Sequence, residues 1–123
     1  MNDCISSIER LDVESNAKAW ELFKFNEIKG VQCPIICALN LSEILIAGGT
    51  FHNSIGKQVG ESYDAYILNV AQMAVRNVSI DRMDFCAGRA VMIVPGKVLW
   101  IFGDCNVHLY DSTTETIENI YGF

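Results

Sequence analysis

Short runs of apolar residues, separated by polar turns, form the dominant pattern of the chain. Four runs are continuous and only four or five residues long, at positions 35–39, 44–47, 90–94 and 98–102. Runs of this length are too short for buried helices and are typical of strands. They do not alternate with polar residues, so each strand should be covered on both faces. The pattern predicts an all-β protein. A helix over residues 14–24, where apolar and charged residues mix, is the competing interpretation.

Turn signals between the runs predict hairpins. Pro95-Gly96 separates the last two runs, and the polar residues around Asn40 and Ser42 separate the first two. Both are typical of tight connections between antiparallel strands.

The runs also repeat along the chain. When the sequence is aligned with itself so that Gly48 lies on Gly103, each early run falls on a late one. A second landmark is an apolar pair followed by Asp or Asn, a polar turn and another strand. It occurs at Asp12, Asn69 and Asp111, and these spacings bracket a period of roughly 50 residues. Asp and Asn at these positions suit turns in which the side chain binds its own backbone.

These features resemble the kelch-repeat family, whose blades are four-stranded antiparallel sheets around a central axis. The family pattern has a glycine doublet after the second strand, a Tyr-Asp-like pair after the third and a tryptophan on the fourth. Three positions of this chain correspond to that tryptophan: one is Trp20, and the other two are Val75 and Ile117. Asp104 replaces the second glycine of the last doublet. The repeat-motif residues, to which we assign structural roles, are Asp12, Trp20, Gly48, Gly49, Tyr66, Asn69, Arg89, Gly96, Gly103, Tyr110 and Asp111.

The resemblance implies about two and a half kelch-type blades: a half blade over residues 5–25, a blade over 31–78 and another over 86–121. The glycine doublet should adopt positive φ, and the residues at the tryptophan position should pack between blades. Closed propellers have about four to eight blades. We therefore expect a fragment or divergent partial product of a larger propeller protein, and, as second choice, a homo-oligomer.

Composition and charge limit the classes of partner that the chain is expected to bind. Nine Lys and Arg against fifteen Asp and Glu give a net charge of −6, which disfavours nucleic acid binding. The apolar stretch 31–51 contains Pro34, Asn40 and Glu43, so we expect two strands rather than a membrane span. No secretory signal pattern opens the sequence, which predicts a cytoplasmic protein.

The five cysteines are odd in number and have no CxxC spacing, which predicts reduced, largely buried thiols. A zinc site from Cys33, Cys37 and Cys86 is the alternative. On a strand, residues four apart lie roughly 13 Å from each other, too far for one ion. A helical segment there would remove this objection.

Candidate catalytic groups are few. His52 and His108 are the only side chains that titrate near neutral pH without perturbation. We expect His52 in a solvated loop and His108 on a strand, and we predict no catalytic set, no metal and no cofactor. Some kelch propellers are enzymes, including copper oxidases, so an enzyme of the galactose-oxidase-like class is one alternative.

Two loops carry the binding candidates. The connection over residues 50–62 is predicted to be a long loop that projects beyond its neighbours, and binding residues concentrate on such loops. A tolerated insertion is the alternative. We expect a non-enzymatic protein–protein interaction module with an unidentified protein partner; a self-assembling structural subunit is a further alternative. The candidate partner-binding residues are Phe51, His52, Lys57, Gln58 and Glu61 in this loop, and Asp81, Arg82 and Phe85 in the loop over 79–87.

Overall fold

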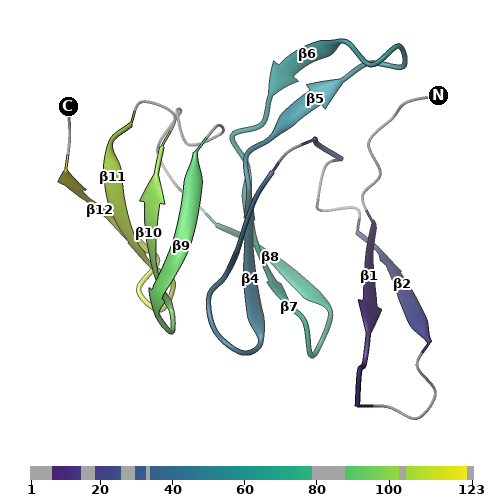
Figure 1. The fold of residues 1–123 in the computed structure, drawn as a ribbon, viewed down its shortest axis with the longest axis horizontal. Coiled ribbons are helices and arrows are strands. Elements are labelled where there is room, and N and C mark those ends of the chain that lie inside the picture. The colour runs from purple at the N-terminus through teal and green to yellow at the C-terminus, as the bar shows by residue number, and fades with distance from the viewer. Residues whose placement is uncertain are drawn as a thin grey trace.

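Twelve strands and no helix make up the described part of the chain (Figure 1). The computed structural model describes residues 7–14, 19–25, 30–32, 34–78, 88–102 and 105–121. All strand pairs are antiparallel. The predicted all-β class is confirmed, and the competing helix is wrong where the chain is described, because Trp20–Lys24 is a strand.

Four sheets contain these strands. The N-terminal sheet has β1 (Ser7–Leu11) and β2 (Trp20–Lys24). The central sheet has the order β3 (Ile35–Ala38), β4 (Glu43–Ala47), β7 (Ala65–Asn69), β8 (Ala74–Val78). The C-terminal sheet consists of β9 (Arg89–Val94), β10 (Lys97–Ile101), β11 (Val107–Asp111) and β12 (Thr116–Tyr121). A hairpin, called the arm below, pairs β5 (Thr50–His52) with β6 (Gln58–Glu61).

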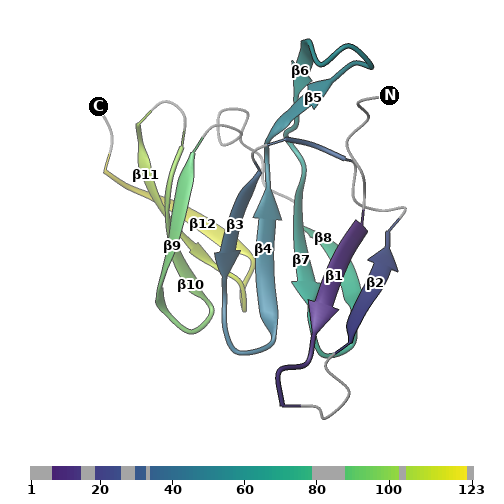
Figure 2. The ribbon, with the colours of Figure 1, turned by 45° about the vertical axis from the view of Figure 1, so that its right-hand side comes forward.

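The N-terminal, central and C-terminal sheets stand side by side in chain order (Figures 1 and 2). β3 and β9, the first strands of the two larger sheets, lie next to each other.

The two larger sheets share one pairing register. Glu43 pairs with Asn69 in the central sheet, and Lys97 pairs with Asp111 in the C-terminal sheet. Lys97 thus occupies the place of Glu43, and Asp111 that of Asn69. The alignment of Asn69 with Asp111 is confirmed, whereas the alignment of the apolar runs that places Gly48 on Gly103 is wrong by one residue. A shift of one residue along a strand exchanges its two faces.

The three Asp and Asn landmarks all begin hairpin turns through their side chains. Asp12 Oδ1 accepts from the Glu14 N–H at 3.0 Å, Asn69 Oδ1 from Ala71 N–H at 3.0 Å and Asp111 Oδ1 from Thr113 N–H at 2.9 Å. The predicted side chain-to-backbone turns are confirmed. The residue before each landmark pairs with a residue at the expected tryptophan position: Leu11 with Trp20, Leu68 with Val75 and Tyr110 with Ile117.

The main hydrophobic core lies between the central and C-terminal sheets. Side chains alternate along a strand, so every second residue of each sheet points into this interface. Trp100 is at its centre, with the rings of Phe102 and Tyr110 edge-on at centroid distances of 5.3 and 6.2 Å. Its buried members are Ile35, Cys37, Leu39, Leu45, Ala47, Ala65, Ile67, Val78, Val98, Trp100, Phe102 and Tyr110.

Turns at one end of the molecule join the same two sheets. The Gly96 N–H donates to Leu39 O at 2.6 Å, and Gly96 O accepts from the backbone and hydroxyl of Ser112 at 2.8 and 3.0 Å. The guanidinium of Arg76 also bridges the sheets, because it contacts Glu115 and lies 3.8 Å from Glu43.

The N-terminal sheet covers only half of the central sheet. Arg10 Nη1 donates to Val70 O at 2.7 Å, which fixes β1 over the β7–β8 hairpin. Beneath it Tyr66 and Leu68 of β7 are buried. On the same face of β3, Ile36 is 65% exposed.

Glycine is required at the predicted doublet. Gly48 and Gly49 have φ of 68° and 94°, as expected, and a Cβ on Gly49 would lie 2.8 Å from Gln32 O. Gly103, its expected counterpart, lies outside the described residues.

Two non-glycine residues adopt left-handed backbone at equivalent turn positions: Met73 with φ 51° and Glu115 with φ 54°. We expect Met73→Gly to raise the free energy of unfolding by about 0.5–1 kcal/mol, since glycine adopts this conformation without the Cβ penalty. Urea denaturation measures the change. Ala71→Gly, in the same turn but without positive φ, is the control and should lower stability; equal effects of both would contradict the prediction.

Gly88 marks a close approach of the chain to β10, where an added Cβ would lie 2.1 Å from Ile101 O. Gly88→Ala should lower the free energy of unfolding by about 3 kcal/mol because backbone must move. Gly60→Ala is matched to it, since its Cβ would meet nothing nearer than Phe51 Cδ2 at 3.8 Å. Thermal denaturation of both variants should show a large decrease only for Gly88→Ala.

Candidate functional site

The arm extends beyond the end of the central sheet, between β4 and β7 (Figures 1 and 2). The sequence predicts a loop here, and this detail is wrong. Phe51 pairs with Gly60 and His52 with Gln58, so most of the segment is a two-stranded ribbon with a bulge.

Asn53 shapes the tip of the arm. Its Oδ1 accepts from the N–H groups of Ile55 and Lys57 at 3.1 and 2.9 Å. Its backbone bonds Lys57 and Gly56 at 3.0 Å, and Gly56 adopts φ 83°. The tip therefore has a defined conformation rather than that of an open loop.

Backbone bonds hold the base of the arm to the body. Gln32 and Thr50 exchange two hydrogen bonds of 2.9 Å, and the Ser62 N–H donates to Gly49 O at 2.8 Å. The Gln32 bonds tie β5 to the segment that precedes β3, and the Ser62–Gly49 bond closes the base of the hairpin itself.

The arm brings together the five binding candidates of this segment. Phe51 and His52 are half-buried, while Lys57, Gln58 and Glu61 are exposed. The Glu61 carboxylate accepts from the Tyr63 hydroxyl at 3.2 Å. Asp81, Arg82 and Phe85, the other candidates, lie outside the described residues.

Three exposed apolar residues near these candidates were missed by the sequence interpretation. Ile55 at the tip is 79% exposed, Val59 on β6 is 62% exposed and Tyr63 follows the arm. The signal for Ile55 is an apolar residue between an Asn and a Gly in a polar segment. Val59 is indistinguishable from a core strand residue without the bulge that turns it outward.

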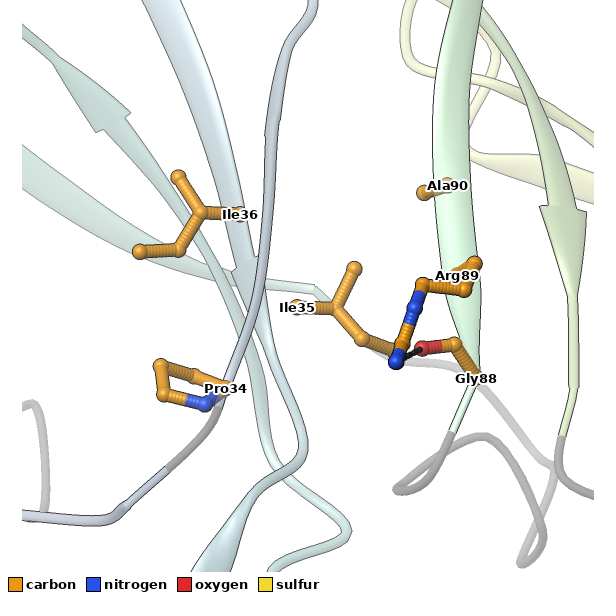
Figure 3. A pocket seen from close by; sticks show the side chains of 6 residues that line it. All are labelled: Pro34, Ile35, Ile36, Gly88, Arg89 and Ala90. Atoms are coloured by element: carbon orange, nitrogen blue, oxygen red, sulfur yellow. Dashed lines mark hydrogen bonds between the residues drawn. The ribbon is translucent and has the colours of Figure 1, made fainter.

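A second concave feature lies between the edge strands β3 and β9 (Figure 3). This cleft of about 390 Å³ is lined by Pro34, Ile35, Ile36, Gly88, Arg89 and Ala90. Arg89 turns back to donate to Gly88 O at 3.1 Å, and Ile35 points toward it. These side chains supply apolar contact and one positive charge, but no nucleophile or general base.

The two histidines lie in different elements. His108 is buried in the C-terminal sheet, where its ring stacks on Phe102 at a centroid distance of 4.0 Å, so it is an interior rather than a surface residue. His52 is half-buried on β5 of the arm, so the expected position in a solvated loop is wrong. The structure does not bring them into one site.

Metal-ligating side chains do not gather in groups of three or more within the described ranges. Cys37 is buried in the core, and desolvation raises the pKa of its thiol, which opposes thiolate formation. Cys33 and Cys86, the other members of the considered zinc site, lie outside those ranges. Cys105 is exposed.

Among the described residues, Tyr110 is the titratable group with the largest pKa shift, and it is fully buried. Desolvation, followed by the negative charge of Glu115, raises its pKa to about 12. Among the described residues its hydroxyl has no hydrogen-bond partner. The neighbouring Asp111 has a lowered pKa because Thr113 donates to its carboxylate.

No protein-family model matches the chain, and no curated protein is significantly similar to it in sequence. Within the described residues, no helix has the length and hydropathy of a membrane span.

Tyr110→Phe tests the buried hydroxyl. At neutral pH the variant should match the wild type or exceed its unfolding free energy by up to about 1 kcal/mol, because an unpaired hydroxyl no longer has to be desolvated.

The pH dependence has a defined sign. The folded state retains the Tyr110 proton up to a pKa of about 12, whereas the unfolded chain ionises at the ordinary value of 10.0. The contribution of Tyr110 to the free energy of unfolding is therefore constant below pH 10 and falls as the pH rises from 10 to 12. Urea unfolding of wild type and Tyr110→Phe at pH 9, 10 and 11 should show a steeper loss in the wild type. Parallel curves would contradict the assignment.

Proposed function

We propose that the chain is a non-enzymatic protein-interaction module of kelch type, acting in the cytoplasm, with the arm as its contact surface. Antiparallel sheets with a common strand order, matching side chain-capped turns and a glycine doublet support the kelch-type interpretation. The sheets then act as blades, and β3 and β9 as neighbouring inner strands.

The observation that carries the interaction role is the exposed apolar surface of the arm. An isolated two-stranded hairpin is marginally stable in water, yet this one is shaped by Asn53 and tied down at its base. It presents Ile55 and Val59 to solvent beside Lys57 and Gln58. An apolar centre with a polar rim is the arrangement that protein interfaces use.

The enzyme alternative requires a nucleophile, a base and an orienting group that converge. His52 and His108, the side chains best suited as bases, lie in separate elements. The cleft beside Arg89 offers binding contacts only. We therefore favour the interaction role over an enzyme of the galactose-oxidase-like class.

The arm is tested by the double variant Ile55→Glu, Val59→Glu. Both side chains are exposed, so circular dichroism and melting temperature should stay at the wild-type values. Leu41→Glu, on the fully exposed turn between β3 and β4, is the control for added charge. Partners captured from extracts of the source cells are quantified by mass spectrometry, and the leading one is purified and titrated by calorimetry.

Wild type and Leu41→Glu should bind the same partner, and the arm variant should bind it at least tenfold more weakly, because interface apolar residues at the centre of a contact dominate its energy. Equal affinity of the three proteins would refute the arm as the contact surface.

A further inference from the structure

The C-terminal sheet has an uncovered apolar face. By the alternation of side chains, Val91, Leu99 and Leu109 form one row on the side that points away from the central sheet. Ile101 and Val107 flank this row. Val91 is 59% exposed, and Leu99 and Leu109 are half-buried.

The N-terminal sheet has a second uncovered apolar face at the opposite end of the molecule (Figure 2). Arg10 fixes which side of β1 meets the central sheet, so Leu11, Trp20 and Leu22 point away from it. Trp20 is 64% exposed, so the expectation that it packs between blades is wrong within this chain, and such exposure is unusual for the largest apolar side chain.

The repeat register shows what each face is built to meet. Leu99 and Leu109 occupy the places of Leu45 and Ile67, which are fully buried against the C-terminal sheet. Trp20 occupies the place of Ile117, which packs into that same interface from the other side. The two free faces are therefore the two halves of an interface that this chain already forms internally.

Charge does not oppose their contact, although the chain carries −6. By alternation, the free face of the N-terminal sheet has Glu9 and Lys24, and that of the C-terminal sheet has two bases and two acids: Arg89, Lys97, Asp111 and Glu118. The described strand positions of each face therefore carry as many bases as acids.

We propose that two copies of the chain associate head to tail, with the C-terminal sheet of one copy stacked on the N-terminal sheet of the other. The contact centres on Leu109 of one copy and on Trp20 and Leu22 of the other. It repeats the arrangement by which Tyr110 and Ile117 of the C-terminal sheet cover Leu45 and Ile67 of the central sheet.

Three stacked sheets per copy give six sheet positions in a pair, within the range in which sheet rings close. The expected product is a closed dimer in which both free faces of each copy are used. Closure rests on the kelch-type ring proposed above, whereas the head-to-tail contact does not.

Light scattering after size exclusion, at micromolar to millimolar concentration, tests the proposal on the full chain. The wild type should have twice the 13.7 kDa mass of one chain. Trp20→Glu and Leu109→Glu should each run at 13.7 kDa, because each face takes part in both contacts of a closed pair. Leu41→Glu should keep the wild-type mass, and Tyr121→Glu, exposed on the same face as Leu109, replaces Leu109→Glu if that variant misfolds.

Mixing the two monomeric variants separates head-to-tail from face-to-face association. The Trp20→Glu copy retains an intact C-terminal face, and the Leu109→Glu copy an intact N-terminal face, so an equimolar mixture should recover one contact and form a heterodimer. If association is head to tail (heterologous), the measured mass rises when the two variants are mixed. If it is face to face (isologous), the mass does not rise.

A monomeric wild type at millimolar concentration, or association that survives both face variants, would overturn the proposal. Open assemblies that both variants reduce to monomers would support the contact and overturn the closed ring. The arm variant should keep the wild-type mass, so loss of partner binding and loss of self-association are read separately.

Discussion

The structure depends on one constraint: a sheet whose strands are apolar on both sides must be covered on both faces. The central sheet meets it fully on one side, where Trp100 and Tyr110 pack onto Leu45 and Ile67. On the other side the central sheet is covered only over β7, which lies beneath Arg10 and Phe23 of the N-terminal sheet. Burial of apolar area is the main stabilising contribution, so the completed interface is where most of the stability of the molecule resides.

The turns help to keep the central and C-terminal sheets stacked, as the same constraint requires. Gly96 joins three hairpin ends through backbone bonds, and Arg76 adds a charged contact between the same two sheets. The ion pairs are half-exposed and contribute little energy. The arm follows β4 directly, and its Thr50 is hydrogen-bonded to Gln32, which precedes β3.

Sequence reasoning predicted strands, hairpins and the Asp and Asn turns because each depends on local chemistry. Asp12, Asn69 and Asp111 cap their turns with their own side chains, and no distant contact is needed. The register of the apolar runs was wrong by one residue, since runs without alternation match equally well in either phase; only the pairing of Glu43 with Asn69 fixes it. The arm was predicted as a projecting segment, but its strands are too short and polar to be distinguished from a loop. Whether Ile55 and Trp20 are exposed depends on neighbours that no local pattern specifies.

The uneven cover of the central sheet has a consequence for how the molecule opens. β7 is buried along nearly its whole length, with one sheet on each face and a hydrogen-bonded strand on each edge. β3 has cover on one face and a free edge, and every second side chain reaches solvent. Local opening therefore costs less at β3 than at β7, so backbone amide exchange should be faster in β3 than in β7. Two strands of one sheet thus differ in lifetime because of what packs on their faces and edges.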